Sequence, residues 1–270
     1  MAILKEQWIP TIIEKLFADN SFASRSADHS AFVAGAKVHV PNAGSLPTVT
    51  VNNTTYPVKA VERIDADLDY ELDKYEVGPV RVGNIEEVQL SYDKRNSVVS
   101  GVRQAVTETV HSTVLSAWIS GCTKAAQKAV AAKFGKAVVM EAKTAFDKQD
   151  IPQDGRCWVL TPTAYNELLQ ELSESEQFAF SASADSAKGV VGKYLGFDFY
   201  MRSVIDTAAS NKTTAFAWHQ ECVSRALGPV DILEDEHRAD YFGDIISATM
   251  LAGGAAIRTD GAGIFKVTSA

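Results

Sequence analysis

Cysteine is scarce in this sequence, and the positions of the three cysteines argue against a disulfide-stabilised fold. Cys122, Cys157 and Cys222 are an odd number, and no two of them form a C-x-x-C pair. The sequence therefore indicates neither a disulfide framework nor a zinc site. This usage is typical of a chain made in a reducing cytoplasm.

Long apolar runs are absent too. The first stretch, MAILKEQWIPTIIEKLF, has no apolar run of signal-peptide length, and no other stretch approaches the ~20 consecutive apolar residues of a membrane span. We therefore expect neither export through a cleaved signal nor a membrane as a partner.

Positive charge is in deficit. The 26 lysines and arginines are outnumbered by 34 aspartates and glutamates, which gives a formal net charge of -8, and there is no basic run. The net charge argues against a protein that binds nucleic acid by neutralising its phosphates. It fits a container that encloses nucleic acid without binding it tightly. With 46% hydrophobic and 22% charged residues, the 270 positions suffice for one large globular domain or two modest ones.

The motifs of common catalytic sites are also missing. The sequence has no G-x-S-x-G nucleophile elbow, and Gly189, Gly192 and Gly196 match neither the G-x-G-x-x-G nor the Walker pattern. We expect these glycines in turns and close contacts. The nearest approach to a reactive or metal-binding pair is His219 with Cys222, because residues three apart would meet on one helical turn. Two such groups without a third do not make a site, so we predict no catalytic residue, no cofactor and no metal ligand.

The longest regular pattern runs from Asn96 to Ser120 and predicts one amphipathic helix. Apolar residues recur there at steps of three and four, as one face of a helix requires: Val99, Val102, Val106, Val110, Val114 and Trp118. We expect Asn96 to cap its N-terminus and Gly121 to form a left-handed C-terminal cap. Valine and threonine are only fair helix formers, so packing must hold this helix in place.

The N-terminal third predicts elements that have little apolar content of their own. We expect a helix around Trp8 to Phe17, and then a polar segment to Gly35 that is either an extended arm on a neighbour or a surface segment of one domain. A strand at Lys37–Val40 follows, then two strands that flank a hairpin loop at Asn52–Thr55. The alternating acids of Arg63–Leu72 predict a strand with one solvent-exposed, acidic face. A calcium site is not indicated, because the glycine and glutamate of the EF-hand pattern are missing.

The remainder predicts an α+β arrangement. The expected elements are a helix at Lys136–Lys148, a fully buried strand at Cys157–Leu160, a helix that starts at Pro162, a loop at Ser173–Lys188, strands within Gly189–Tyr200, a strand at Thr213–Trp218, tail strands at Asp244–Met250 and Ala255–Arg258 around Gly253 and Gly254, and a turn at Asp260–Gly261 before a last strand at Ile264–Val267.

In this order the pieces resemble the major capsid (coat) proteins of tailed bacteriophages, the Hong Kong 97-type fold. The resemblance rests on collinear short motifs: the helix around Gln7–Pro10, the strand Lys37–Pro41, the acidic hairpin region, the long helix, the segment DKQDIPQDGRCWVLTP at Asp147–Pro162, the segment GKYLGFDFY at Gly192–Tyr200, and the tail from Glu234 to Arg258.

The resemblance implies a division of the chain and a set of partners. Residues 1–36 would be an N-terminal arm, 37–135 a strand, an extended loop near 41–84 and the spine helix of a peripheral domain, 136–230 an axial domain, and 231–270 tail strands of the peripheral domain. The chain would assemble with itself into hexamers and pentamers of an icosahedral shell around double-stranded DNA, in the cytoplasm of a bacterial host. The resemblance also implies a portal, and it implies a separate scaffolding protein because the chain starts directly with the arm helix.

Two further points stay open at this stage. Some relatives join a lysine to an asparagine between subunits, but nothing around Lys59 or Lys74 marks either as a reacting residue. The other functions that we considered are a hydrolase or transferase of unrecognised α+β fold that uses His219 and Cys222, and an encapsulin-like nanocompartment shell that holds an enzyme in place of DNA.

Overall fold

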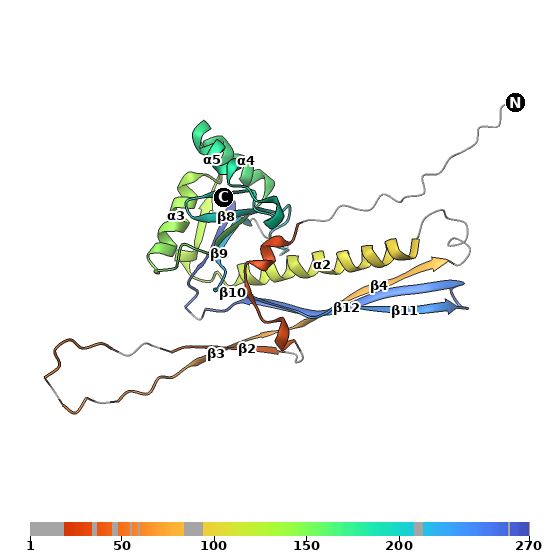
Figure 1. Ribbon diagram of the computed structural model, residues 1–270, viewed down its shortest axis with the longest axis horizontal. Coiled ribbons are helices and arrows are strands. Elements are labelled where there is room, and N and C mark those ends of the chain that lie inside the picture. The colour runs from red at the N-terminus through yellow and green to blue at the C-terminus, as the bar shows by residue number, and fades with distance from the viewer. Residues whose placement is uncertain are drawn as a thin grey trace.

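The structure is a computed structural model of the chain, and it is elongated (Figure 1). It describes residues 19–33, 37–44, 48–54, 56–58, 60–83, 94–207, 213–258 and 260–269. The helix predicted around Trp8 to Phe17 lies outside these residues. No helix of the described ranges is both long and apolar enough to cross a membrane.

A long sheet forms one half of the molecule. Its central strand, β12 (Gly243–Ala256), pairs along one edge with β4 (Asp73–Gly83) and along the other with β11 (Asp231–Arg238) and then β10 (Val223–Leu227). All of these pairings are antiparallel. β12 has 14 residues and is one continuous strand, so it gives the sheet its length.

The prediction of two tail strands separated at Gly253 and Gly254 is therefore wrong. Both glycines are paired with β10, opposite Ala226 and Arg225. A Cβ at Gly254 would lie 2.8 Å from Cγ1 of Val114, and one at Gly253 would lie 2.6 Å from the carbonyl oxygen of Glu71. These glycines let neighbouring elements approach the strand closely, and they do not form a turn.

Helix α2 (Lys94–Ser120) packs against this sheet and runs along the direction of β12 and β4 (Figure 1). The predicted valine face is confirmed from Val102 onward, since Val102, Val106, Val110, Val114 and Trp118 are all buried, whereas Val99 is only half-buried. The predicted caps are wrong. The helix begins at Lys94, which places Asn96 inside its first turn. Gly121 does not have a positive φ. A Cβ there would lie 2.5 Å from the Cβ of Ala256, so close packing explains this glycine.

The other half is an α/β lobe built on a six-stranded sheet, whose spatial order is β5-β13-β9-β6-β8-β7. These strands are β5 (Lys128–Ala131), β13 (Ile264–Ser269), β9 (Thr213–His219), β6 (Arg156–Leu160), β8 (Phe197–Met201) and β7 (Gly192–Tyr194). The helices are α3 (Lys136–Asp147), α4 (Pro162–Glu171) and α5 (Glu174–Ala182). The predicted helices at 136 and 162 and the predicted strands at 157, within 189–200, at 213 and at 264 are confirmed, whereas β5 was not predicted.

Strand β6 shows how the lobe is joined to the long helix. All five of its residues are buried, as the continuous apolar run predicts. Cys157 and Val159 belong to the core that includes the buried face of α2, whereas Trp158 and Leu160 belong to the core beneath α3, α4 and α5. Because successive strand residues point to opposite faces, this one sheet divides the two cores.

The segment Ser173–Lys188 is not the loop that its polar composition predicts. It contains α5 and a short 3-10 helix, η4 (Ser186–Lys188). Ser173 and Glu176 form a capping box at the start of α5. The S-x-x-E spacing that signals such a start was present in the sequence, but the serine and alanine content obscured it.

The described part of the N-terminal arm lies on its own chain. It consists of η1 (Ser21–Ser24), the two-residue strand β1 (Ala27–Asp28), which runs parallel to β10, and η2 (Ser30–Phe32). Phe22 is 1% exposed, and its ring centroid lies 6.1 Å from that of Trp118 and 6.3 Å from that of Trp218. Of the two possibilities left open for residues 19–33, a surface segment of one domain is therefore the observed one.

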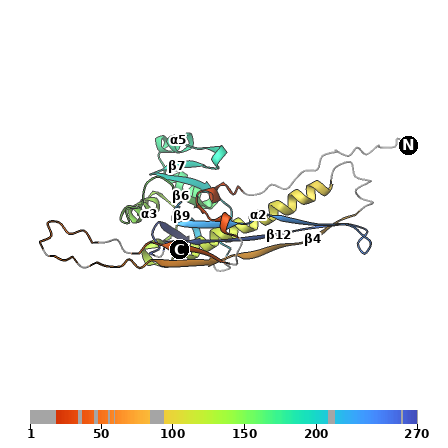
Figure 2. The same ribbon diagram turned by 60° about the horizontal axis from the view of Figure 1, so that its bottom comes forward.

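A two-stranded ribbon, β2 (Lys37–Asn42) and β3 (Ala66–Glu71), projects from the long sheet and continues into a loop (Figures 1 and 2). The predicted strand at Lys37 and the strand with an acidic face are confirmed. The two strands expected on either side of Asn52 are wrong, because residues 48–54, 56–58 and 60–65 form no ladder. Asn52 does have a positive φ of 53°, as expected for an asparagine in a turn.

Replacing Trp118 tests the packing of α2. Its side chain is fully buried, and its indole Nε1 donates to the carbonyl oxygen of Ser224 at 2.7 Å. We expect Trp118→Ala to lower the free energy of unfolding by about 3–5 kcal/mol. The exposed Gln104 lies on the same helix, and Gln104→Ala should change that free energy by less than about 0.5 kcal/mol. Urea denaturation of both variants measures this difference, and equal midpoints would contradict the role given to Trp118.

Candidate interaction surfaces

His219 and Cys222 do not form a reactive or metal-binding pair in the structure. They lie at the end of β9 and in the turn that follows, not on a helix. Nδ1 of His219 accepts from the backbone N–H of Glu221 at 3.3 Å, which leaves Nε2 to donate to the carbonyl oxygen of Asp154 at 2.8 Å. Both ring nitrogens are thus occupied by backbone groups, so the imidazole cannot act as a base toward the thiol.

The three thiols are equally unsuited to nucleophilic chemistry. Burial raises the pKa of Cys122 and of Cys157 to about 12, and it raises the pKa of Cys222 to about 11. The reactive form of cysteine is the thiolate, so these groups are inert near neutral pH. Within the described ranges there is also no group of three histidine, cysteine, aspartate or glutamate side chains that could hold a metal ion. The features of the described residues that point to a function are therefore exposed surfaces.

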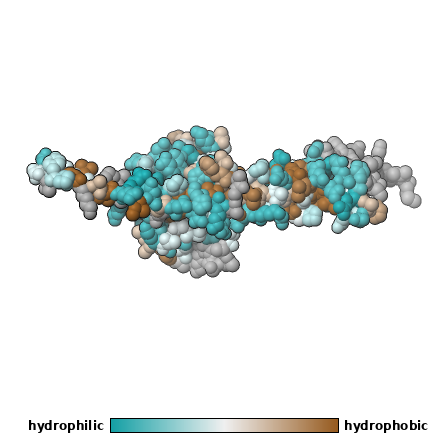
Figure 3. Space-filling view, turned by 90° about the horizontal axis from the view of Figure 1, so that it is seen from below, coloured by the Kyte–Doolittle hydropathy of each residue, from teal (hydrophilic) through white to brown (hydrophobic). Residues whose placement is uncertain are grey.

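The most unusual surface is the loop beyond the ribbon, which we call the apolar loop (described residues 48–54, 56–58 and 60–64). Its large apolar side chains are exposed to fractions between 66% and 88%: Val49, Val51, Tyr56, Val58, Val61 and Ile64. Figure 3 shows hydrophobic patches along this projecting part. Single exposed apolar side chains are ordinary, but a run of six on one extended segment marks an interaction site.

The ribbon behind the apolar loop presents an acidic face. Asp67, Asp69 and Glu71 alternate along β3, and Lys37 and His39 stand opposite them on β2. Lys37 Nζ lies 3.3 Å from Asp69 and 3.2 Å from Glu71, and His39 Nδ1 lies 2.8 Å from Asp67. Hydrogen bonding from Lys37 lowers the pKa of Asp69, so this carboxylate stays ionised. The other face of the ribbon is apolar, with Val38 and Tyr70 buried against the long sheet.

Ion pairs hold the ends of the long elements in place. At the start of α2, Arg95 lies 2.6 Å from carboxylate oxygens of both Glu234 and Glu236 on β11. In the arm, Arg25 donates to Asp198 of β8 at 2.9 Å. Arg225 of β10 donates to Asp28 at 3.0 Å. These contacts join the helix and the arm to the sheets that they cover, at positions that apolar periodicity alone did not reveal.

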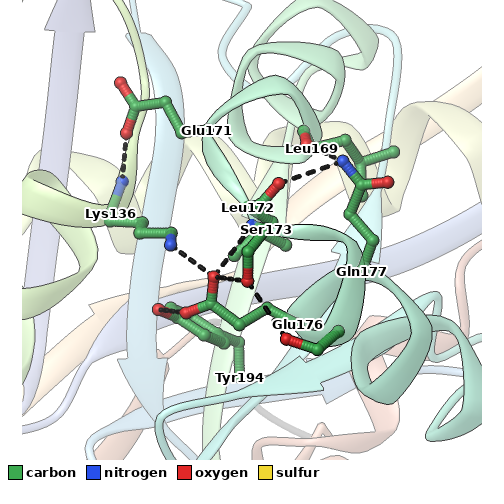
Figure 4. Close-up of polar contacts among 9 residues, drawn as sticks. Lys136, Leu169, Glu171, Leu172, Ser173, Glu176, Gln177 and Tyr194 are labelled. Carbon is green, nitrogen blue, oxygen red and sulfur yellow. Dashed lines mark hydrogen bonds and ion pairs between the residues drawn. The ribbon is translucent and has the colours of Figure 1, made fainter.

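A polar cluster ties the three helices of the lobe to its edge strand (Figure 4). The carboxylate of Glu176 accepts from Lys136 Nζ of α3, from the backbone N–H of Ser173 at 2.9 Å and from its hydroxyl at 2.7 Å. The hydroxyl of Tyr194 on β7 donates to the other oxygen at 3.3 Å. Glu171 of α4 accepts from the backbone N–H of Lys136 at 2.8 Å. The cluster therefore links α3 with α4, α5 and β7.

Comparison with known proteins assigns this architecture to a class. The sequence model of a family described as "Phage capsid protein" matches residues 101–270, from the spine helix to the end of the chain. No curated protein sequence matches. The chain belongs to the phage capsid protein family.

The fold agrees with that assignment. A structure of Mycobacterium phage Che8 is similar with a TM-score of 0.70 and 17% identity, over 98% of this chain and 97% of that one. The capsid of cyanophage P-SCSP1u gives a TM-score of 0.77 at 13% identity, over 99% and 93%. The capsid of a native GTA particle gives 0.77 at 12% identity, over 99% and 96%. The fold is the Hong Kong 97-type fold, as the motif order predicted.

The protein is therefore a major capsid protein, a structural subunit that assembles with copies of itself into the shell of a virion. The alternative of an enzyme that uses His219 and Cys222 is not supported, since phage capsid proteins are structural. The apolar loop, which exposes six large apolar side chains on one copy, is consistent with this conclusion.

Removing the carboxylate of Glu176 tests the polar cluster. Hydrogen bonding from Lys136, and then from Ser173, lowers the pKa of Glu176 from 4.5 to about 2. A lowered pKa means that the contribution to stability is complete above pH 4.5 and is lost as the pH falls toward 2. We expect Glu176→Gln to be less stable than wild type at neutral pH, with the two melting temperatures converging in that acid range.

Glu174→Gln is the matched control, because it removes another carboxylate from the first turn of the same helix. Its effect should be smaller than that of Glu176→Gln. Thermal melts of both variants between pH 7 and pH 2 provide the measurement. A Glu176→Gln variant that is as stable as wild type at every pH would show that the cluster contributes nothing.

Proposed function

We propose that this chain forms hexamers and pentamers that close into an icosahedral shell around double-stranded DNA. The observation that carries the proposal is the apolar loop, whose six large apolar side chains have no cover within the described chain. A two-stranded ribbon is marginally stable alone in water. A second copy beneath the ribbon and loop would remove this apolar surface from water, with a gain of roughly 25 cal/mol per Å².

We infer the following division of labour. Residues 1–36 serve as the arm, residues 37–135 as the extended loop and spine of a peripheral domain, residues 136–230 as the axial domain at capsomer centres, and residues 231–270 as peripheral tail strands. Strand pairing supports two adjustments to these boundaries. β5 and β13 pair within the sheet of the lobe, and β10 pairs with β12 of the long sheet. We therefore assign β5 and β13 to the axial domain and β10 to the peripheral domain.

The remaining partners follow from the assembly of such a shell. A portal at one vertex and a separate scaffolding protein would act with this chain in the cytoplasm of a bacterial host. The net charge of -8 favours enclosure of DNA without tight or sequence-specific binding. We do not propose a covalent link through Lys74, because its ammonium group is paired with Glu76. Lys59 lies outside the described residues.

Sedimentation velocity with negative-stain electron microscopy tests the proposal on the purified chain, alone and with its neighbouring genes co-expressed. Closed particles, or rings of five and six, are the expected result. A stable monomer or dimer under every condition would overturn it. Nuclease-resistant DNA inside the particles is expected, whereas particles that hold a protein cargo and no DNA would favour the nanocompartment alternative.

A double substitution in the apolar loop tests how the shell is held. Each valine is worth about 1.5–3 kcal/mol when it is fully buried. Val49→Ser with Val61→Ser should therefore weaken each contact by about 3 kcal/mol, which is more than a hundredfold in affinity. We expect few or no particles, while the melting temperature of the isolated subunit stays unchanged because both side chains are exposed there.

The matched control is Val204→Ser, since Val204 is also exposed, at 51%, but lies in the α/β lobe. This variant should form particles at the normal yield. Complete particles from the double variant would show that the apolar loop is not a contact between copies.

A further inference from the structure

A group of lysines without partner acids lies where the spine helix meets the α/β lobe. The segment Cys122–Lys136, which leads from α2 through β5 to α3, contains four lysines and no aspartate or glutamate. Lys124, Lys128 and Lys133 are exposed, and a fifth lysine, the half-buried Lys266, lies on the neighbouring strand β13. We call Lys124, Lys128 and Lys266 the lysine cluster.

The strand register brings the cluster together. Lys128 and Lys266 are direct neighbours in the parallel pairing of β5 and β13, so their side chains leave the same face of the sheet about 4.8 Å apart. The environment of Cys122 agrees with this placement, because burial raises the pKa of this thiol while Lys266 and Lys128 both act against that rise through space. Lys124 is held nearby by its hydrogen bond to the carbonyl oxygen of Asp260.

The charge of the cluster is not neutralised within the described chain. Lys124 and Lys128 donate to backbone carbonyl oxygens, those of Asp260 and Thr123, and no ion pair involves any of the three lysines in the ranges that the structure covers. In a protein with a net charge of -8, this is an isolated positive patch. Such a patch attracts a negatively charged surface.

The ribbon supplies a surface of the opposite sign. Residues 37–42 and 60–76 carry seven carboxylates and three cationic side chains: Glu62, Asp65, Asp67, Asp69, Glu71, Asp73 and Glu76 against Lys37, Arg63 and Lys74. On the acidic face, Asp67, Asp69 and Glu71 recur every second residue, which is about 6.8 Å along the strand. The repeat exceeds the strand spacing of about 4.8 Å between Lys128 and Lys266 by about 2 Å, a difference that two flexible lysine side chains can cover.

We propose that the lysine cluster of one copy receives the acidic face of the β2–β3 ribbon from a second copy of this chain. The inference rests on the proposed function, since it names the surface on which the projecting ribbon lies. The ribbon extends away from the main body of its own chain (Figures 1 and 2), and no hydrogen bond or ion pair joins it to the cluster among the described residues. The apolar loop then continues past the cluster, so burial supplies affinity while the charges set the register.

Charge reversal on each side tests the contact. Lys128→Glu with Lys266→Glu makes the cluster acidic, and Asp67→Lys with Glu71→Lys makes the ribbon basic while the pair of Lys37 with Asp69 is kept. Each double variant should lower the yield of closed particles by about tenfold or more, because like charges then meet at the contact. The chain that carries all four substitutions should recover wild-type yield.

A mixture shows whether the contact is between copies. The two double variants, each unable to assemble alone, should form rings of six when mixed in equal amounts, because alternating copies place opposite charges at every contact. A contact within one chain would be restored in the fourfold variant but not in the mixture. Failure of both the fourfold variant and the mixture, with the subunits folded by circular dichroism, would overturn the proposal.

Two controls distinguish a contact at the cluster from a general effect of charge and from binding of DNA. Lys148→Glu reverses an exposed lysine outside the cluster and should leave the yield unchanged. If the variant Lys128→Glu with Lys266→Glu instead forms shells at the normal yield but encloses less DNA, the lysines bind phosphate groups of DNA, and the proposed contact is wrong. Wild-type particles distinguish these failures from failure of the proposed function, which predicts that the unchanged chain assembles.

Discussion

The structure depends on covering one face of α2. This face consists of valines, which have low intrinsic helix propensity, and of one tryptophan with a large apolar side chain: Val106, Val110, Val114 and Trp118. The helix is therefore stable only where this face is removed from water. β12 covers most of it, and Phe22 of the arm closes the remainder by packing on Trp118. The six-stranded sheet then uses one of its faces for the same core and the other for the helices of the lobe.

This arrangement explains the shape of the molecule. The core is complete where α2, β12 and the lobe meet, and the long sheet, the ribbon and the apolar loop extend away from it (Figure 1). Extended elements of this kind bury little surface within one chain. In a closed shell the same types of contact recur between copies, so a surface left open on one copy can meet a complementary surface on another. We therefore infer that the exposed side chains of the apolar loop and the charges of the ribbon serve contacts between copies.

Much of the architecture was predictable from local patterns. The period of 3.6 residues identified α2 and α3, the unbroken apolar run identified β6, and the alternating acids of β3 identified an exposed strand face. Errors occurred where the deciding partner lies far away in the chain. Gly253 and Gly254 lie within a strand because β10 pairs with them there. The strands expected near Asn52 are a different kind of error, since the described residues of 48–65 form no ladder. A helix cap was expected at Gly121, but close contact with Ala256 explains that residue.

The sequence by itself therefore determined the long helix, the helices at 136 and 162 and several of the strands, that no familiar reactive motif is present, and, through the order of its motifs, the family. Only the tertiary structure decided that both ring nitrogens of His219 are engaged by backbone groups, that Glu176 joins α5 to α3 and β7, and that Lys128 and Lys266 share one face. The physical reason is the separation along the chain over which each effect acts. Propensity and periodicity act over a few residues, whereas hydrogen bonding, burial and charge depend on neighbours that only the folded chain brings together.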